Sequence, residues 1–162
     1  MKTIRLMMMP VLASAAVFAA ETAVGVGAAP LKPTLQSLKC GAGQHAVSDG
    51  EGFFCLAGSS QMGERLNGPA ISIHKNGVKS GEGRYVNGAR EGLWVFFDDQ
   101  GNKVKEIEFK SDNYNGRFVE YANGRKIREE NWVNGVRQGP QLSFDASGVA
   151  TITEFRDGKP VK

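Results

Sequence analysis

The sequence predicts an all-β fold, an antiparallel meander of stacked β-hairpins with about four units of 23–24 residues, preceded by a small disulfide-bounded module. Three observations predict this fold: glycines recur at a nearly constant spacing, aromatic residues recur with them, and the intervening residues are typical of short strands. Glycine accounts for 21 of the 162 residues and proline for only 6. This balance favours turns between strands over a proline-rich disordered tail.

The repeat occupies residues 67–162 and is visible in four columns of equivalent positions. The glycines that open successive units lie 24, 24 and 23 residues apart: Gly68, Gly92, Gly116 and Gly139. The glycines of the internal turns are spaced 24, 23 and 24: Gly77, Gly101, Gly124 and Gly148. An aromatic column is spaced 24, 23 and 23: Tyr85, Phe109, Trp132 and Phe155. A fourth column ends the units: Gly88, Asp112, Gly135 and Gly158. A period of this length is typical of repeat architectures.

Within each unit the local sequence predicts two strands and a turn. Asn123-Gly124 allows the positive φ angles of a two-residue hairpin turn. In the stretch 104–109, Ile107 and Phe109 share one face and Glu106 and Glu108 the other, as in a half-buried strand. The stretch 93–97 is apolar on both faces, so we expect it to be the best-buried strand. In the last unit Gln141 replaces an aromatic and Ile152 replaces a glutamate, which is typical of a capping repeat.

The N-terminus has the pattern of a secretory signal peptide. Two positive charges within residues 1–5 precede the uncharged, apolar-rich run 6–20. We expect a signal peptide over residues 1–19, cleaved after Ala19, with cleavage after Ala28 as the alternative. An uncleaved N-terminus is the other reading, and membrane contact is expected only in that case. Residues 20–39 are rich in Ala, Gly and Pro and are predicted to form a linker.

The two cysteines define a second module, residues 40–66. Cys40 and Cys55 are the only cysteines, and in an oxidising compartment such a pair forms a disulfide. The alternative is a redox-active thiol, but no Cys-x-x-Cys spacing is present. We therefore predict a structural disulfide in an exported protein, periplasmic or extracellular.

The repeat residues carry a resemblance to a known family. Gly92, Leu93 and Trp94, followed by Phe97, Gly101, Glu106 and Phe109, resemble the bacterial variant of the MORN repeat, the type of the YwqK-like antitoxin family. The unit that begins at Gly116 matches it well, and the first and last units match it less well. The resemblance implies an elongated, twisted sheet used for binding or scaffolding. It also implies an antitoxin role for some members, which fits poorly with an export signal.

Catalytic chemistry is not indicated by the sequence. We expect no catalytic residues, no metal site and no cofactor, because His45 and His74 are the only histidines and neither lies in a ligand motif. The formal net charge is +3 with interleaved signs, which argues against nucleic acid as a partner. Three glutamates recur with the repeat and are expected to be surface positions paired with a base on a neighbouring strand: Glu82, Glu106 and Glu129.

These observations together predict an exported, non-enzymatic repeat protein that binds a protein partner or acts as a scaffold through its sheet surface. The alternatives are an antitoxin or immunity-like protein that neutralises one toxin, and a carboxylate-dependent glycan hydrolase. Core packing is the preferred interpretation of Trp94, Phe96, Tyr121 and Trp132. By residue type alone, the candidates for partner binding are Trp94, Tyr121, Arg117, Arg125 and Arg128. The sequence predicts neither the partner nor the oligomeric state.

Overall fold

The computed structural model describes residues 30, 32–59 and 63–161. They form one antiparallel sheet of 13 strands, with the strand order β1-β2-β3-β4-β6-β7-β8-β9-β11-β12-β13 and with β5 and β10 as short additions to β4 and β9. The elements are η1 (Leu35–Ser37), β1 (Gln44–Ser48), β2 (Gly52–Ser59), β3 (Gly63–Ile73), β4 (Lys79–Val86), β5 (Ala89–Arg90), β6 (Gly92–Phe97), β7 (Lys103–Lys110), β8 (Asn113–Ala122), β9 (Arg125–Val133), β10 (Val136–Arg137), β11 (Gly139–Phe144), β12 (Ala150–Arg156) and β13 (Lys159–Pro160). The predicted fold class is confirmed.

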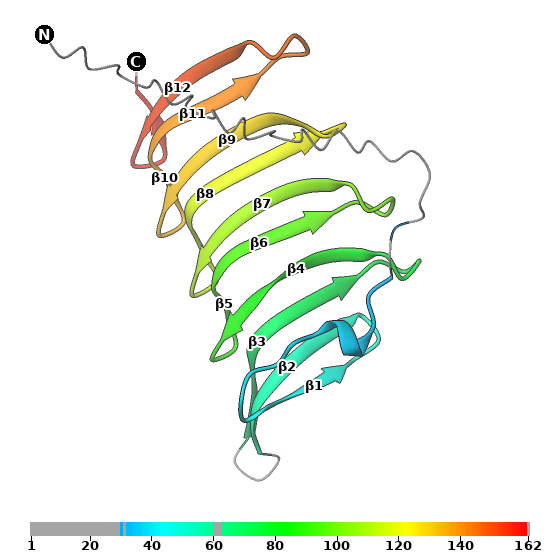
Figure 1. Ribbon diagram of the computed structural model, residues 1–162. Coiled ribbons are helices and arrows are strands. Elements are labelled where there is room, and N and C mark those ends of the chain that lie inside the picture. Colours follow the sequence, from blue (N-terminus) through cyan, green and yellow to red (C-terminus); the bar gives the residue numbers. More distant parts are fainter. Residues whose placement is uncertain (1–29, 31, 60–62, 162) are drawn as a thin grey trace, which may run out of the picture.

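The chain follows a simple meander in which sequence order is spatial order (Figure 1). The strands lie side by side and the hairpin turns line the two long sides of the sheet. The cysteine-bounded module is continuous with the repeats, because β2 pairs with β3 along most of its length. The expected boundary between residues 66 and 67 therefore falls inside a strand rather than at a linker.

The predicted glycine-bearing turns have the expected backbone conformation. Asn123 and Gly124 have φ angles of 50° and 72°, as a two-residue hairpin turn requires. Asn134 and Gly135 repeat this pair with φ angles of 50° and 80°. Asp112, which stands in a glycine column, also has a positive φ angle of 66°. Aspartate tolerates this region better than most residues, and this explains why the column accepts it.

Backbone hydrogen bonds connect the turns of successive units. The Gly88 amide donates to the Leu66 carbonyl at 2.8 Å, and the Gly135 amide donates to the Tyr114 carbonyl at 2.8 Å. The same bond recurs from Asp112 to the preceding unit. Each two-residue turn is therefore attached to the unit before it. These recurring hydrogen bonds account for both the constant repeat length and the stacking of the units.

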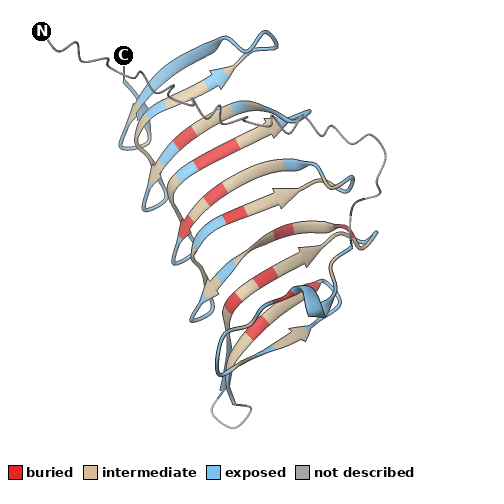
Figure 2. Cartoon of the chain, viewed as in Figure 1, coloured by how far each residue is buried: buried red, intermediate tan, exposed pale blue. Residues whose placement is uncertain are grey.

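The core lies on one face of the sheet, which we call the aromatic face. Its buried cluster consists of Ala70, Trp94, Ile107, Phe109 and Phe118, and Phe54, Tyr85, Phe96, Tyr114 and Trp132 pack against it. Figure 2 shows the buried positions following one another from strand to strand across the middle of the sheet. Edge-to-face contacts join neighbouring rings, with centroids 5.1 Å apart for Tyr85–Trp94 and 5.2 Å for Tyr114–Trp132. Contacts between aromatic rings therefore connect neighbouring strands along this face of the sheet.

The prediction that β6 is the best-buried strand is wrong, because it has one buried residue whereas β7 and β8 have two each. Trp94 is 3% exposed, which confirms the prediction of core packing, and a Cβ at Gly83 would collide with its indole ring. Leu93, on the opposite face, is 54% exposed. The apolar residues of this strand therefore divide between the core and an exposed surface.

The described end of the expected linker packs on the sheet. Residues 32–39, which we call the strap, contain the short helix η1, and Leu38 is buried. Lys32 lies beside the turn at Gly77, so the strap crosses from one side of the sheet to Cys40. Residues 32–39 were predicted to be part of a linker, but they pack on the sheet. Burial of Leu38 holds them there although they form no strand. The signal peptide predicted over residues 1–19 lies outside the described residues.

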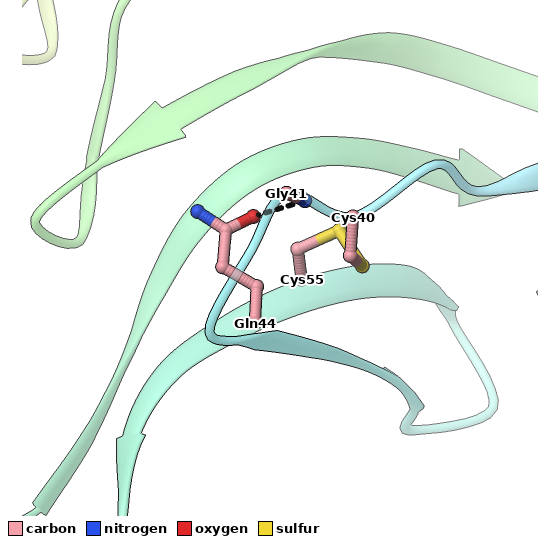
Figure 3. Close-up of a disulfide and its surroundings, with 4 residues drawn as sticks. All are labelled: Cys40, Gly41, Gln44 and Cys55. Atoms are coloured by element: carbon pink, nitrogen blue, oxygen red, sulfur yellow. Dashed lines mark hydrogen bonds between the residues drawn. A yellow bond between two sulfur atoms is a disulfide. The ribbon is translucent and has the colours of Figure 1, made fainter.

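The predicted disulfide joins Cys40 to Cys55 across 15 residues (Figure 3). Beside it, the Gly41 amide donates to the Gln44 side-chain oxygen at 2.9 Å. Cys55 is 1% exposed, and a Cβ at Gly68 would lie only 2.9 Å from the Cβ of this cysteine. The disulfide therefore fastens the strap to β2 at a closely packed point.

Candidate interaction surfaces

The second face of the sheet, which we call the charged face, carries a repeated group of three side chains. In each of the first three units a lysine pairs with a glutamate three residues later, and it also lies over an aromatic ring of the neighbouring strand. The groups are Lys79–Glu82 with Phe97, Lys103–Glu106 with Tyr121, and Lys126–Glu129 with Phe144. The ion pairs measure 2.8, 2.6 and 2.5 Å between nitrogen and oxygen.

The glutamates are thus surface positions paired with bases, and the main base is on the same strand rather than across from it. Glu129 also has a partner on the adjacent strand, Arg117, at 2.9 Å. The lysine column was overlooked in the sequence, although its spacings of 24 and 23 residues match those of the glutamates.

These ion pairs shift the acid–base behaviour of the carboxylates. The hydrogen bond from Lys103 holds the pKa of Glu106 below its ordinary value, and the Tyr121 hydroxyl, which donates to the same carboxylate at 3.1 Å, acts in the same direction. The hydrogen bond from Lys126 lowers the pKa of Glu129. Val119 lies opposite both glutamates in the strand register and has no exposed surface. The charged face is therefore a network of ionised groups over an aliphatic layer.

The aromatic face carries cations above its rings. The Arg90 guanidinium lies 4.1 Å from the centroid of Phe109, and that of Arg137 lies 4.7 Å from the centroid of Phe155. Arg90 is also bound to Asp112 at 2.7 Å, and this hydrogen bond lowers the pKa of Asp112. Glu130 is the buried charged residue of this face, and its carboxylate accepts a hydrogen bond from Trp132 at 2.8 Å.

The five residues predicted to bind a partner do not form one patch. Trp94 is buried in the core, so its place among the exposed candidates is corrected. Tyr121 and Arg117 belong to the charged face, where both contact glutamates. Arg128 pairs with Glu120 at 2.5 Å, and in the strand register it lies on the aromatic face. Arg125 is exposed beside the Asn123-Gly124 turn. Residue type alone could not separate these positions, because the two faces alternate along each strand.

A groove of about 450 Å³ lies between the strap and the charged face of β3, β4 and β6. Leu38 forms one wall, and the floor includes Ile71, Leu93 and Val95. Two side chains of opposite charge, Lys39 and Glu82, also line it. Leu93 contributes an exposed apolar side chain to this floor, so the groove offers an apolar surface with charges at its sides.

In the part of the chain that the structure describes, no three His, Cys, Asp or Glu side chains gather as a metal site would require. His45 lies 3.5 Å from Glu64, and the ring nitrogen Nε2 of His74 is 2.9 Å from the Phe97 carbonyl oxygen. The described helices include none with the length and apolar character that a membrane span needs.

The comparisons with known proteins do not assign the chain to a family. No protein-family model matches it, and no curated protein matches it. Among solved structures, a crystal structure of the accessory secretory proteins 1, 2 and 3 of Streptococcus pneumoniae is similar over 80% of this chain, with 6% sequence identity and a TM-score of 0.31. This chain spans 22% of that chain.

Proposed function

We propose that this chain is an exported, non-enzymatic module that binds a protein partner through the surface of its repeat sheet. The observation that carries the proposal is the groove beside the strap, where Leu93 is 54% exposed and lies with the half-buried Ile71 and Val95. Exposed apolar surface on a soluble protein is typical of an interaction site.

The composition of the groove suits an extended protein segment. Leu93 is 54% exposed and would be covered by an apolar side chain of the partner. Lys39 and Glu82 lie at the sides, where they would face charged or polar groups of an extended chain. Leu93 is already about half buried, so covering the rest of its side chain contributes about 1 kcal/mol, or about fivefold in affinity. An aspartate at this position would add the cost of burying a charge against the partner.

Export is supported by two independent features. The N-terminal residues have the charge and hydropathy pattern of a signal peptide, and Cys40 and Cys55 form a disulfide. Disulfides persist mainly in oxidising compartments outside the cytosol. We therefore place the protein in the periplasm or outside the cell, with the partner in the same compartment.

The proposal is tested by affinity capture from an envelope fraction with purified, disulfide-bonded protein. We expect the wild-type chain to retain a specific protein, and Leu93→Asp to lower its recovery at least tenfold. Val133→Asp is the matched control, because Val133 is similarly exposed, at 52%, on a different hairpin. Circular dichroism verifies that both variants fold. Equal recovery with Leu93→Asp, or no protein retained above a blank resin, would contradict the proposal.

A further inference from the structure

The last full-length strand of the sheet, β12, leaves one side unpaired. In each of the first three units the second strand of the hairpin pairs on its outer side with the next unit: β4 with β6, β7 with β8, and β9 with β11. The contact that joins β9 to β11 is made by Arg128 and Glu129. The repeat period places Thr151 and Ile152 at the same positions in β12. Among the described residues, only the short β13 pairs on that side, at Phe155 and Arg156.

The open edge of β12 lacks the lysine–glutamate pair that each of the first three units carries. Ile152 occupies the column of the three paired glutamates, and Val149 stands three residues before it, as the lysines stand before the glutamates. Ile152 is 65% exposed and Val149 is 62% exposed, the highest values among the exposed large hydrophobic side chains that the structure describes. Natural proteins usually protect edge strands with charged residues, above all lysine. The stretch 149–153 instead reads Val-Ala-Thr-Ile-Thr, uncharged and rich in β-branched residues.

The repeat itself shows what such an edge accepts. The three strands that pair on the outer sides of earlier units share the pattern Gly-x-x-aliphatic-x-aromatic: Gly92-Val95-Phe97, Gly116-Val119-Tyr121 and Gly139-Leu142-Phe144. In every case the aliphatic residue lies opposite the glutamate of the column. A strand added to β12 in the same way would place its aliphatic side chain against Ile152, so that both lose water.

The described residues offer no unpaired segment with this pattern. The pattern occurs three times in the sequence, each time in a strand that is already paired on both sides. The other free edge of the sheet, β1, reads Gln-His-Ala-Val-Ser and contains no aromatic residue. A second copy that paired through its own β12 would also bring no aromatic residue within Ala150–Thr153. A segment of another protein that carries the pattern would fit this edge as the chain's own strands fit the earlier ones.

We propose that the open edge of β12 binds an extended segment of a partner protein by antiparallel strand addition, and that the segment carries an aliphatic residue two positions before an aromatic one. Main-chain hydrogen bonds to the β12 edge would supply part of the affinity, and the contact with Ile152 would supply the selectivity. This inference deepens the proposed function, on which it rests, by naming the class of partner and a second contact area outside the groove.

The test uses the full, disulfide-bonded chain and a fluorescein-labelled peptide of residues 113–133, which contains Val119 and Tyr121 in a hairpin with its own Asn-Gly turn. Fluorescence anisotropy measures binding. The control peptide carries Val119→Lys and Tyr121→Lys. We expect the first peptide to bind at least tenfold more tightly than the control, and Ile152→Glu in the protein to remove this difference. Val136→Glu, at another exposed valine, is the matched protein variant and should keep it.

Amide hydrogen exchange locates the bound peptide. We expect exchange to slow in residues 150–153 of the protein when the first peptide is added, and to stay unchanged with the control peptide. Absence of binding, equal binding of both peptides, or unchanged affinity in Ile152→Glu would overturn the proposal. A wild-type dimer that Ile152→Glu converts to a monomer would also overturn it, since the occupant would then be a second copy. Because purified components are used, failure here leaves the capture experiment with Leu93→Asp as a separate test of protein binding.

Discussion

The two ends of the sheet are finished in different ways. At the first end the strap, the disulfide and the strands β1 and β2 cover the repeat, and Cys55 and Leu38 are buried. At the last end β12 and its turn leave Val149 and Ile152 exposed, and the aromatic face thins out because Gln141 stands where Trp94 and Phe118 stand in earlier units. Both ends of the sheet have a free edge strand, but only the first end is fastened by a disulfide and packed against the strap. Repeat arrays usually need a capping unit at each end for stability. At its second end this array has instead an edge strand, β12, that can still accept another strand.

The largest expected effect compares equivalent phenylalanines in the middle and at the last end. Phe109 is 3% exposed and belongs to the buried cluster, so Phe109→Ala should lower the free energy of unfolding by about 3–5 kcal/mol. Phe155, in the same column, is only partly buried, and Phe155→Ala should cost about 1–2 kcal/mol. Urea unfolding followed by tryptophan fluorescence measures both. Equal losses would show that the last unit is packed as firmly as the centre.

The disulfide at the first end is the next test. Replacing both cysteines, in Cys40→Ser/Cys55→Ser, reopens a loop of 15 residues and should lower the free energy of unfolding by about 3 kcal/mol. Treatment of the wild-type chain with a reductant should produce a similar loss, whereas the double variant should not respond to it. A loss below about 0.5 kcal/mol would mean that the strap is held by Leu38 and its neighbours alone.

The smallest expected effect concerns pH and separates the units that carry a lysine–glutamate pair from the last unit, which lacks it. The pKa values of Glu106 and Glu129 are lowered in the folded chain by their lysine partners. Their ion pairs therefore stabilise the fold above the ordinary glutamate pKa of about 4.3, and this contribution is lost as the pH falls through the lower folded values. Both ion pairs lie at the surface, with side chains 18% and 24% exposed for Glu106 and Glu129, so solvent screens them and the effect is modest.

The measurement is the midpoint of urea unfolding between pH 6 and pH 3. Glu106→Gln and Glu129→Gln should each flatten the fall in this midpoint at the acid end. Glu154→Gln on β12 is the matched control, because no lysine lies three residues before it, and it should keep the wild-type slope. A steeper acid fall in Glu106→Gln would contradict the assigned direction of the pKa shift.

Turns and strand positions could be predicted from the sequence because they depend on local conformational needs. A positive φ angle is costly for most side chains, so Gly124 and its equivalents mark the turns wherever the hairpins repeat. The same columns place Phe109 and Trp132 on one face. The disulfide could be predicted as well, since Cys40 has only one possible partner.

The candidate surfaces could not be predicted in the same way because they depend on contacts between distant segments. Leu38 lies in a stretch without periodicity, and only the folded chain shows that it covers the charged face. The sequence favours core packing for Trp94 but also makes it a binding candidate by residue type, and only the fold, in which its ring fills the space above Gly83, decides for the core. The exposed Ile152 was noticed as a departure from the repeat, but its meaning depends on the strand order, which leaves its outer side open.

Native-state hydrogen exchange of the full chain tests the central claim most directly. If one continuous sheet is fastened and packed at its first end and exposed at its last, amides of β3, β6, β7 and β8 should exchange most slowly and those of residues 150–153 should exchange much faster. Cys55 and its neighbours should be protected in the oxidised chain. Equal protection of β12 and β7 would contradict the account, because the last strand would then be covered in solution as the central strand β7 is.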